Sequence, residues 1–331
     1  MQKLDFGVIG VGHLGRYHVQ LAAEIPEINL VGAFDLNHEQ ASGICSSCGT
    51  KAFSSLEDLL DRVDAVSIVV PTSQHCQVGL KCLEHNCHLF IEKPITSTVK
   101  EAEQLIARAD QAKRIIQVGH IERFNPAVLA AAKYEIRPMF IEAHRLSRFN
   151  PRGLDVSVVL DLMIHDLDLI LYLVKSRVNS IDACGVSVVS EAEDIANVRL
   201  KFQSGCVANL TSSRISLNPM RRMRLFQKNQ YIALDFMEKK ADIFQLKEPG
   251  YQAAPGSSGM TVSRIGVGDQ ARDVVYEKPE APDVNALQME LEEFAGAVLN
   301  GREPEVPGAQ GRQALEVANA ILAQIASPDP V

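Results

Sequence analysis

The sequence predicts an N-terminal α/β domain with a parallel sheet, followed by an α+β domain with a large open sheet that is mixed or antiparallel. Two observations predict this. Through the first ~120 residues, short apolar runs alternate with helix-like stretches, which is typical of βαβ units. Beyond them, strand-like runs alternate apolar and polar residues, as strands with one face in water do. We expect the two domains to span residues 1–121 and 122–331.

The first strand is the apolar run over residues 6–9, and a G-x-G-x-x-G turn follows it. Between a strand and a helix, this pattern suits a dinucleotide pyrophosphate. The first glycine permits the tight turn, the second lets the backbone approach the phosphates, and the third lets the helix pack on the strand. The helix N-terminus then offers N–H groups to the anion. The residues expected to bind the cofactor here are Gly10, Gly12, His13, Leu14 and Gly15.

A second apolar run, over residues 28–34, ends at Asp35. This acid follows Gly15 by the ~20 residues expected for the carboxylate that holds the adenosine ribose. Such a carboxylate accepts hydrogen bonds from both ribose hydroxyls and repels a 2′-phosphate. The expected cofactor is therefore NAD, and NADP is disfavoured. A glycine-rich turn that binds nothing is the weaker alternative.

The remaining elements follow from periodicity and from turn residues. In the first domain we expect helices over 39–48, 56–60, 77–84 and 99–111, and strands over 65–70, 88–91 and 115–119. In the second we expect strands over 139–145, 180–186, 194–200 and 206–210, a helix over 158–175 and a long mobile loop over 249–273. Two closing helices, over 285–299 and 309–325, could pack back on the first domain.

The composition argues against some classes of binding partner and of cellular location. The net charge of −8 offers no basic field for nucleic acid or an anionic membrane. No apolar run approaches the ~18 residues of a membrane span, and the N-terminus has no signal-peptide pattern, so we expect a cytoplasmic protein. The seven cysteines are scattered, as free thiols are in a reducing compartment. Cys45 and Cys48 form half of a possible redox or zinc site that nothing nearby completes, so no metal is expected.

Two groups of residues could do chemistry. Lys93 lies in Glu92-Lys93-Pro94, directly after a predicted strand, at the sheet edge where ligands bind in such folds. It could reach a substrate hydroxyl, or it could be a loop lysine in water. Asp161 and His165 are four residues apart on an apolar helix, where a carboxylate can orient an imidazole and raise its basicity. A buried structural histidine and a metal-ligand pair are the weaker alternatives.

These motifs resemble the glucose-fructose oxidoreductase, inositol dehydrogenase and MocA (Gfo/Idh/MocA) family. The resemblance extends to Pro71-Thr72-Ser73-Gln74-His75, Arg123-Phe124-Asn125-Pro126 and the helix at 290–294. It implies a Rossmann domain, NAD or NADP, and a sugar or cyclitol substrate. Site roles follow by resemblance alone. Lys93 would polarise the reacting oxygen, His165 would exchange its proton, and Asp161 would bind substrate and steer His165. Pro71, Thr72 and His75 would line the adenosine side, and Glu92 and Pro94 would meet the nicotinamide.

The stretches 119–126 and 160–166 resemble a narrower group, the bacterial UDP-N-acetylglucosamine 3-dehydrogenases that precede an aminotransferase in lipid A precursor synthesis. Met163 departs from the wider family, where many members place glycine between the acid and the histidine. Arg123, Asn125 and Arg145 are expected to bind substrate together with Asp161. Guanidinium groups match phosphate oxygens, so further arginines could grip a diphosphate: Arg148, Arg152, Arg214, Arg221, Arg222 and Arg224.

The expected function is therefore NAD-dependent oxidation of a secondary sugar hydroxyl, at C3 of a UDP-N-acetyl sugar. Three alternatives stay open: a dehydrogenase of a free cyclitol or hexose, a biliverdin-type reductase, and a non-catalytic NAD-sensing regulator. A broad apolar sheet face left in water is unusual for a soluble protein. We therefore expect a homodimer or homotetramer that packs through the second domain's sheet.

Overall fold

The computed structural model describes residues 3–150, 156–252 and 259–326. The chain divides into two units. Unit 1 comprises residues 1–121 and 284–316, and unit 2 comprises residues 122–283 and 317–331.

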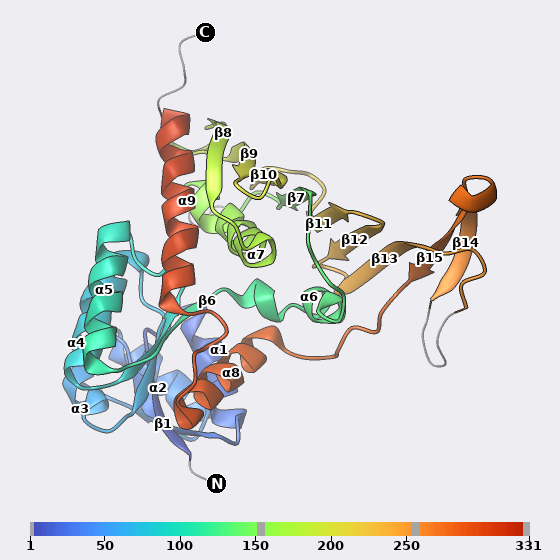
Figure 1. The fold of residues 1–331 in the computed structure, drawn as a ribbon. Helices are drawn as coiled ribbons and strands as arrows, with labels where there is room; N and C mark the ends of the chain where they lie inside the picture. Colours follow the sequence, from blue (N-terminus) through green and yellow to red (C-terminus); the bar gives the residue numbers. More distant parts are fainter. Residues whose placement is uncertain (1–2, 151–155, 253–258, 327–331) are drawn as a thin grey trace. The chain divides into compact units, whose positions relative to one another are not determined.

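Unit 1 has a six-stranded parallel sheet (Figure 1). Its strands are β1 (Leu4–Ile9), β2 (Ile28–Phe34), β3 (Lys51–Ala52), β4 (Ala65–Ile68), β5 (His88–Glu92) and β6 (Ile116–Gly119). The strand order is β3-β2-β1-β4-β5-β6. Successive strands are added on one side of β1 up to β3 and on its other side from β4 onward. In doubly wound sheets, ligands bind at the carboxyl ends of the strands beside such a change of side. The predicted Rossmann fold is confirmed.

The helices of unit 1 are α1 (Gly15–Glu24), α2 (His38–Ser47), α3 (Leu56–Leu60), α4 (Thr72–Glu84), α5 (Val99–Ala112) and α8 (Ala286–Asn300). Helix α4 begins at Thr72, directly after Pro71, and thus earlier than the periodicity indicates. Helix α8, from the end of the chain, packs against α1 and β1. Its Phe294 meets Phe6 and Phe90 edge to face, with ring centroids 6.3 and 5.9 Å apart, which joins α8 to the core of the sheet.

Unit 2 has a nine-stranded mixed sheet in the order β14-β15-β13-β12-β11-β7-β10-β9-β8 (Figure 1). Its strands are β7 (Phe140–Leu146), β8 (Val178–Val186), β9 (Ile195–Phe202), β10 (Val207–Ser213), β11 (Met220–Gln227), β12 (Gln230–Asp235), β13 (Lys240–Lys247), β14 (Met260–Ile265) and β15 (Arg272–Glu277). Neighbouring strands are antiparallel except for the parallel pair β7 and β10. The large mixed sheet confirms the predicted class of the second domain.

Helices cover one face of this sheet. Helix α7 (Ile164–Val174) packs on β7, and α6 (Pro126–Ala131) packs on β12 and β13. Side chains such as Ile141, Leu225 and Ile243 are fully buried beneath them. Helix α9 (Gly308–Ala326) begins in unit 1 and ends in unit 2. On the opposite face, strand side chains such as Glu142, His144 and Arg199 line an open surface cavity.

One sequence prediction is wrong in part. The region 249–273 was expected to be a loop, but it contains strand β14 and the start of β15. All six residues of β14 are exposed, and the strand has a single partner strand, β15, at the edge of the sheet. It therefore lacks the buried face that produces a recognisable pattern. Residues 253–258 of the expected loop lie outside the described residues.

The glycine turn that joins β1 to α1 is closely packed at its two ends. Gly10 has φ +89°, a left-handed conformation that favours glycine. A Cβ added to Gly15 would lie 1.9 Å from the carbonyl oxygen of Gly10. A Cβ added to Gly12 would meet nothing within 4 Å among the described residues. The turn thus leaves an open position at Gly12, where a cofactor phosphate can approach the backbone.

Gly12→Ala should therefore separate cofactor binding from folding. The new methyl group enters open space, so the thermal midpoint of the cofactor-free protein should stay within about 2 °C of the parent. It also fills the space for the pyrophosphate, so the dissociation constant for NAD should rise at least about tenfold by calorimetry, a cost of about 1.4 kcal/mol. Gly15→Ala is the matched control, and it should lower the thermal midpoint because backbone must move. Unchanged NAD affinity in Gly12→Ala would contradict this interpretation.

Candidate active site

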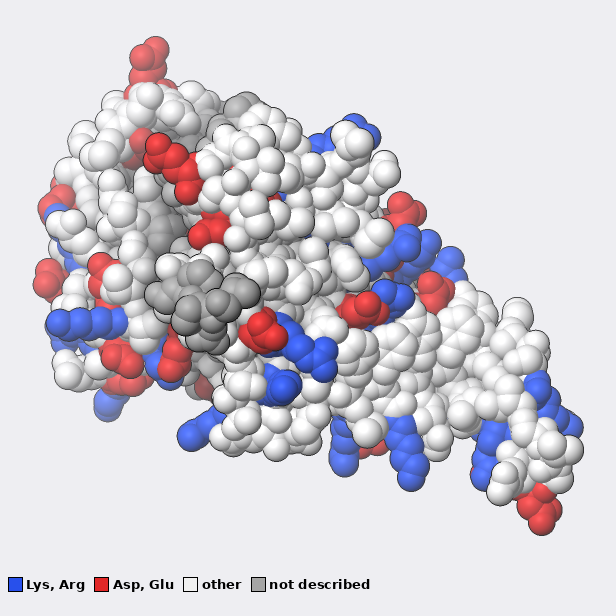
Figure 2. Space-filling model, turned by 90° about the horizontal axis from the view of Figure 1, so that it is seen from above, with Lys and Arg blue, Asp and Glu red and all other residues white. Residues whose placement is uncertain are grey.

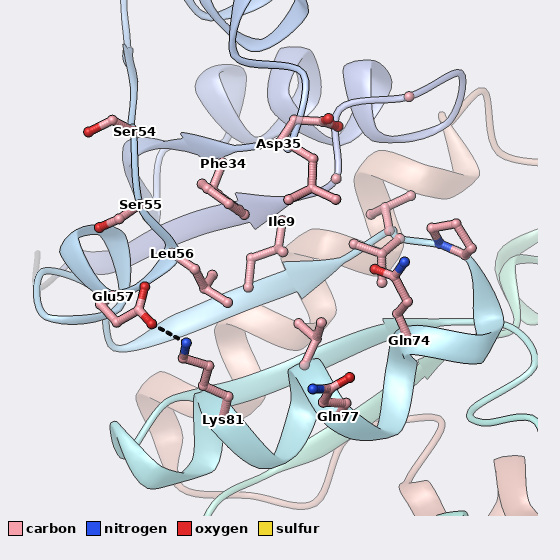
Figure 3. A pocket seen from close by; sticks show the side chains of 17 residues that line it. Ile9, Phe34, Asp35, Ser54, Ser55, Leu56, Glu57, Gln74, Gln77 and Lys81 are labelled. Carbon is pink, nitrogen blue, oxygen red and sulfur yellow. Dashed lines mark hydrogen bonds and ion pairs between the residues drawn. The ribbon is translucent and has the colours of Figure 1, made fainter.

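The adenosine end of the site is a cavity of 660 Å³ in unit 1 (Figure 3). Apolar side chains form its floor, among them Ile9, Phe34 and Leu56. Asp35 stands at one end, and the ion pair of Glu57 with Lys81 closes the other. A volume in this range suits a small-molecule ligand, and apolar walls with a few polar groups are typical of such sites. The sequence analysis missed the lining residues from α3 and α4, because only the folded sheet brings them beside Asp35.

Asp35 is held in place by backbone groups. Its Oδ2 accepts a hydrogen bond from the N–H of Val11 at 2.6 Å, and its Oδ1 accepts one from the N–H of Asn37 at 2.8 Å. Gln40 donates to the carbonyl oxygen of Val11 at 2.7 Å, which steadies the same turn. The carboxylate therefore lies at the edge of the cavity next to the glycine turn. It suits a ribose diol and opposes a 2′-phosphate, in agreement with NAD as the cofactor.

The other residues of the turn leave the start of α1 open to an anion. Leu14 precedes the helix and provides no capping side chain. His13 packs edge to face on Tyr17, with ring centroids 6.0 Å apart. The uncapped helix N-terminus carries partial positive charge, which favours a bound phosphate. Together with the open position at Gly12, this geometry fits the pyrophosphate of NAD.

The residues expected on the adenosine side do not all face the cavity. Pro71 lines it, and Thr72 opens helix α4. The ring of His75 is 1% exposed and lies between two backbone carbonyls, with Nδ1 2.9 Å from the oxygen of Pro94 and Nε2 2.9 Å from that of Val70. The contacts of His75 are therefore with the backbone of its own unit.

The segment Glu92-Lys93-Pro94 leaves the carboxyl end of β5, as the sequence predicts. Lys93 is half-buried, and the peptide bond between Lys93 and Pro94 is cis. The Glu92 carboxylate lies 3.2 Å from His18 Nε2 and accepts a hydrogen bond from the N–H of Lys93 at 3.1 Å. Burial alone would raise the pKa of Glu92. The contact with His18 and the charge of Lys93 outweigh burial and lower that pKa below its ordinary value.

Asp161 and His165 lie on one continuous helical segment in unit 2. The first part of this segment is not the predicted α-helix. Residues Val159–Met163 form a π-helix, and the α-helix α7 continues from Ile164. Both side chains are half-buried. A π-helical turn holds more residues than an α-helical one, so the four-residue spacing does not place the two side chains as an α-helix would. Such π-turns occur frequently at functional sites.

Two acids that follow His165 in the sequence, Asp166 and Asp168, are held by buried arginines. Arg145 binds both oxygens of Asp166, at 2.8 and 2.9 Å, and also contacts Glu122 at 2.8 Å. Arg123 binds both oxygens of Asp168, at 2.8 and 2.6 Å. Burial raises the pKa of Asp166 despite the adjacent guanidinium. These two bidentate arginine–carboxylate pairs hold the helix that carries His165 against β7 and against the short 3₁₀ helix Ile121–Phe124.

Arg123, Asn125 and Arg145 therefore have the contacts of structural residues, which differ from the substrate-binding role expected from the sequence. Both arginines are less than 5% exposed. Asn125 caps α6 through the N–H of Ala127 at 3.0 Å and donates to Glu122 at 3.0 Å. The sequence shows that these positions are charged or polar, but it does not show which partners the fold brings to them.

Several of the other arginines also pair within unit 2. Arg222 contacts Asp235 at 2.8 Å and Arg224 contacts Glu142 at 2.6 Å, both on the face of the sheet without helices. Arg214 is buried near Asp194, at 3.9 Å. Arg148 donates to the carbonyl oxygen of Leu217 at 3.3 Å. Arg221 is exposed on β11, and Arg152 lies outside the described residues.

The described ranges contain neither a candidate metal cluster nor a helix that could span a membrane. No group of three or more His, Cys, Asp or Glu side chains there could hold a metal ion. All seven cysteines are free thiols, and burial raises the pKa of Cys45. No helix in the described part of the chain is long and apolar enough to cross a bilayer. Figure 2 shows basic and acidic side chains interspersed on the visible face of the molecule.

Comparison with known proteins matches both parts of the chain to one family. Residues 4–120 match the oxidoreductase family with an NAD-binding Rossmann fold, and residues 110–231 match the GFO/IDH/MocA C-terminal domain. A UDP-N-acetylglucosamine 3-dehydrogenase from Acidithiobacillus ferrooxidans is 39% identical over 96% of this chain and 96% of that protein. An inositol 2-dehydrogenase from Rubrobacter xylanophilus is 24% identical over 99% of this chain and 93% of that protein.

The solved structures agree. A crystal form of the Acidithiobacillus ferrooxidans UDP-N-acetylglucosamine 3-dehydrogenase superposes with a TM-score of 0.86 and 36% identity, covering 98% of each chain. An oxidoreductase domain protein from Kribbella flavida has a TM-score of 0.83 at 19% identity, covering 99% of this chain and 98% of that one, and shows the shared fold. The chain is an NAD-dependent dehydrogenase that belongs to the Gfo/Idh/MocA oxidoreductase family.

Proposed function

We propose that this dehydrogenase oxidises the C3 hydroxyl of a UDP-N-acetyl sugar, such as UDP-N-acetylglucosamine, to a ketone. One observation carries the proposal: the 39% identical relative that bears the name of this activity matches the chain over nearly its whole length. The site residues support it. Unit 1 holds the features that fit NAD and carries Lys93, while unit 2 carries Asp161 and His165.

The chemistry divides among these residues. Oxidation of a secondary alcohol removes a hydride from carbon and a proton from oxygen, and bound NAD supplies the hydride acceptor. We assign His165 to accept the hydroxyl proton and Asp161 to bind substrate and orient the imidazole. Lys93 stabilises negative charge as it develops on the oxygen. The buried pairs of Arg145 with Asp166 and of Arg123 with Asp168 hold the helix on which the proton acceptor stands.

The product of this reaction is a 3-keto sugar nucleotide, and a ketone is what an aminotransferase consumes. We accordingly place the protein in the cytoplasm, before an aminotransferase in lipid A precursor synthesis. The second candidate substrate is a free cyclitol, which the inositol 2-dehydrogenase relative favours.

The open face of the unit 2 sheet supports a further part of the proposal, a homo-oligomer that packs through this face. Five aromatic side chains lie in register across five strands, each half-buried: Phe140, Phe226, Tyr231, Phe244 and Tyr276. Successive ring centroids are 5.6, 4.9, 5.7 and 5.0 Å apart. Pairs of opposite charge such as Arg224 with Glu142 lie beside this aromatic row. A row of this kind suits an identical face of a second copy.

Calorimetry should identify the substrate class. In the presence of NAD, the protein should bind UDP with a dissociation constant at least about tenfold lower than that for inositol, a difference of about 1.4 kcal/mol or more. Turnover of UDP-N-acetylglucosamine should accompany NADH formation at 340 nm. Tight binding of inositol or biliverdin without binding of UDP would reassign the substrate. NAD binding without turnover of any of these substrates would favour a sensor.

Lys93→Met should abolish turnover and leave NAD binding largely intact. The methionine side chain occupies similar space but carries no charge to stabilise the oxygen, so kcat should fall by at least about 10²-fold, in the range seen when one electrostatic donor is removed. Steady-state kinetics and NAD calorimetry measure the two effects. Lys100→Met, at an exposed position on α5, is the matched control and should behave as the parent. Loss of NAD affinity with normal turnover would contradict the role of Lys93.

Tyr231→Glu should break the assembly. A carboxylate in the middle of the aromatic row would be buried without a partner charge when two such faces meet. Light scattering after size exclusion should show a smaller species than the parent. Val188→Glu places the same charge on an exposed apolar residue between β8 and β9, and it should leave the assembly unchanged. A monomeric parent protein, or an unaltered Tyr231→Glu oligomer, would rule out this interface.

A further inference from the structure

A chain of buried hydrogen bonds crosses unit 1 and ends next to Lys93. The hydroxyl of Ser67 on β4 lies 2.8 Å from Nδ1 of His18 on α1, and Nε2 of the same ring lies 3.2 Å from Oε1 of Glu92 at the end of β5. Ser67 and His18 are fully buried, and the Glu92 side chain is 14% exposed. One neutral tautomer satisfies both contacts, because Nδ1 accepts from the hydroxyl while Nε2–H donates to the carboxylate.

The Glu92 carboxylate is also enclosed by its neighbours. Its Oε2 accepts a hydrogen bond from the backbone N–H of Lys93. On the adjacent strand β6, a Cβ added to Gly119 would lie 3.1 Å from the carboxylate atoms, so a glycine stands where the carboxylate needs room. The His18 ring packs edge to face on Phe90, with centroids 5.5 Å apart, which limits its rotation. The position of Glu92 is therefore fixed from three sides.

A second buried histidine contacts the other neighbour of Lys93. His75 on α4 lies 2.9 Å from the carbonyl oxygen of Pro94 and equally close to that of Val70. Burial lowers the pKa of His75, although both carbonyls oppose this change. A neutral imidazole carries a single N–H, so only one of these carbonyls can accept a hydrogen bond from it. The tautomer protonated at Nδ1 donates to the carbonyl oxygen of Pro94, the residue that follows Lys93.

We propose that His18 and His75 are positioning residues for Lys93. His18 acts on the residue before it, through the carboxylate of Glu92, and His75 acts on the residue after it, through the carbonyl of Pro94. Because the residues on both sides of Lys93 are held, the backbone at Lys93 is fixed. Its side chain therefore projects in a defined direction. The proposal rests on the proposed function, in which Lys93 stabilises charge on the reacting oxygen. Neither histidine touches the reacting atoms in this account.

The first test uses the cofactor-free protein. His18→Leu removes the hydrogen-bond donor to Glu92, so the Glu92 carboxylate can move. The hydrogen bond from the Lys93 N–H should then open more often, and exchange of that amide should accelerate at least about tenfold. Mass spectrometry of peptides that span residues 89–96 measures the rate. His18→Gln can still donate to Glu92, so it should restore slow exchange. His85→Leu, on a half-buried histidine that follows α4 and contacts Asp61, is the control.

The second test is the pH profile of kcat. Burial raises the pKa of Glu92, and the contact with His18 opposes this change. Loss of the contact in His18→Leu should therefore raise that pKa, although the charge and N–H of Lys93 still lower it. Glu92 then takes up a proton at higher pH than in the parent, and the acid limb of the profile should move to higher pH. At the optimum, kcat should fall about 10- to 100-fold through misplacement of Lys93, with KM for NAD changed less. His75→Leu should lower kcat similarly without moving the acid limb.

The outcomes distinguish the inference from the function on which it rests. If Lys93→Met is inactive while His18→Leu keeps parental kcat, acid limb and amide exchange, the positioning role is wrong and the proposed function stands. If Lys93→Met turns over normally, the catalytic assignment fails, and amide exchange still shows whether His18 holds the backbone. Should His18→Leu fail to fold, Glu92→Gln provides the same test, and parental kcat in that variant would overturn the inference.

Discussion

Three carboxylates withdrawn from water stand beside the proposed catalytic residues, and each is held by a specific donor. Glu92 precedes Lys93 and meets His18, Asp166 follows His165 and meets Arg145, and Asp168 meets Arg123. A charge out of water is costly unless it is paired and hydrogen-bonded. This cost makes the geometry specific, because a helix or loop that shifts would leave a charge without its partner. The residues next to the proposed catalytic side chains are thus held by buried electrostatic contacts within each unit.

The sequence predicted what depends on local pattern. The glycine turn, Asp35, the alternating elements and the Glu92-Lys93-Pro94 segment each carry a signal within a few residues, and the structure has them at the carboxyl edge of a parallel sheet. His18 carried no such signal. Its partners Ser67 and Glu92 lie 49 and 74 residues away along the chain, so only the folded sheet shows why a histidine stands there.

What the sequence did not show has the same physical origin. Arg123 and Arg145 were expected to bind substrate, because the sequence shows no internal anion for either guanidinium group. The fold supplies that anion internally, from the helix that carries His165. The aromatic row was invisible because its five members belong to five strands, and strand register is set by pairings over long separations. Strand β14 was missed because an exposed edge strand buries no face.

The parallel pairing of β7 with β10 has a consequence for synthesis of the protein. Phe140 on β7 lies opposite Val207 on one side and Phe226 on the other, so the central strand acquires both neighbours only after the chain has grown beyond β11. Until then β7 has unpaired backbone N–H and C=O groups along both of its edges. Sheets whose strands pair over long sequence separations form slowly. Until they form, unpaired strand edges stay exposed and promote aggregation. Nascent chains halted between β7 and β11 should therefore be the aggregation-prone species, and chaperone demand should peak there during translation.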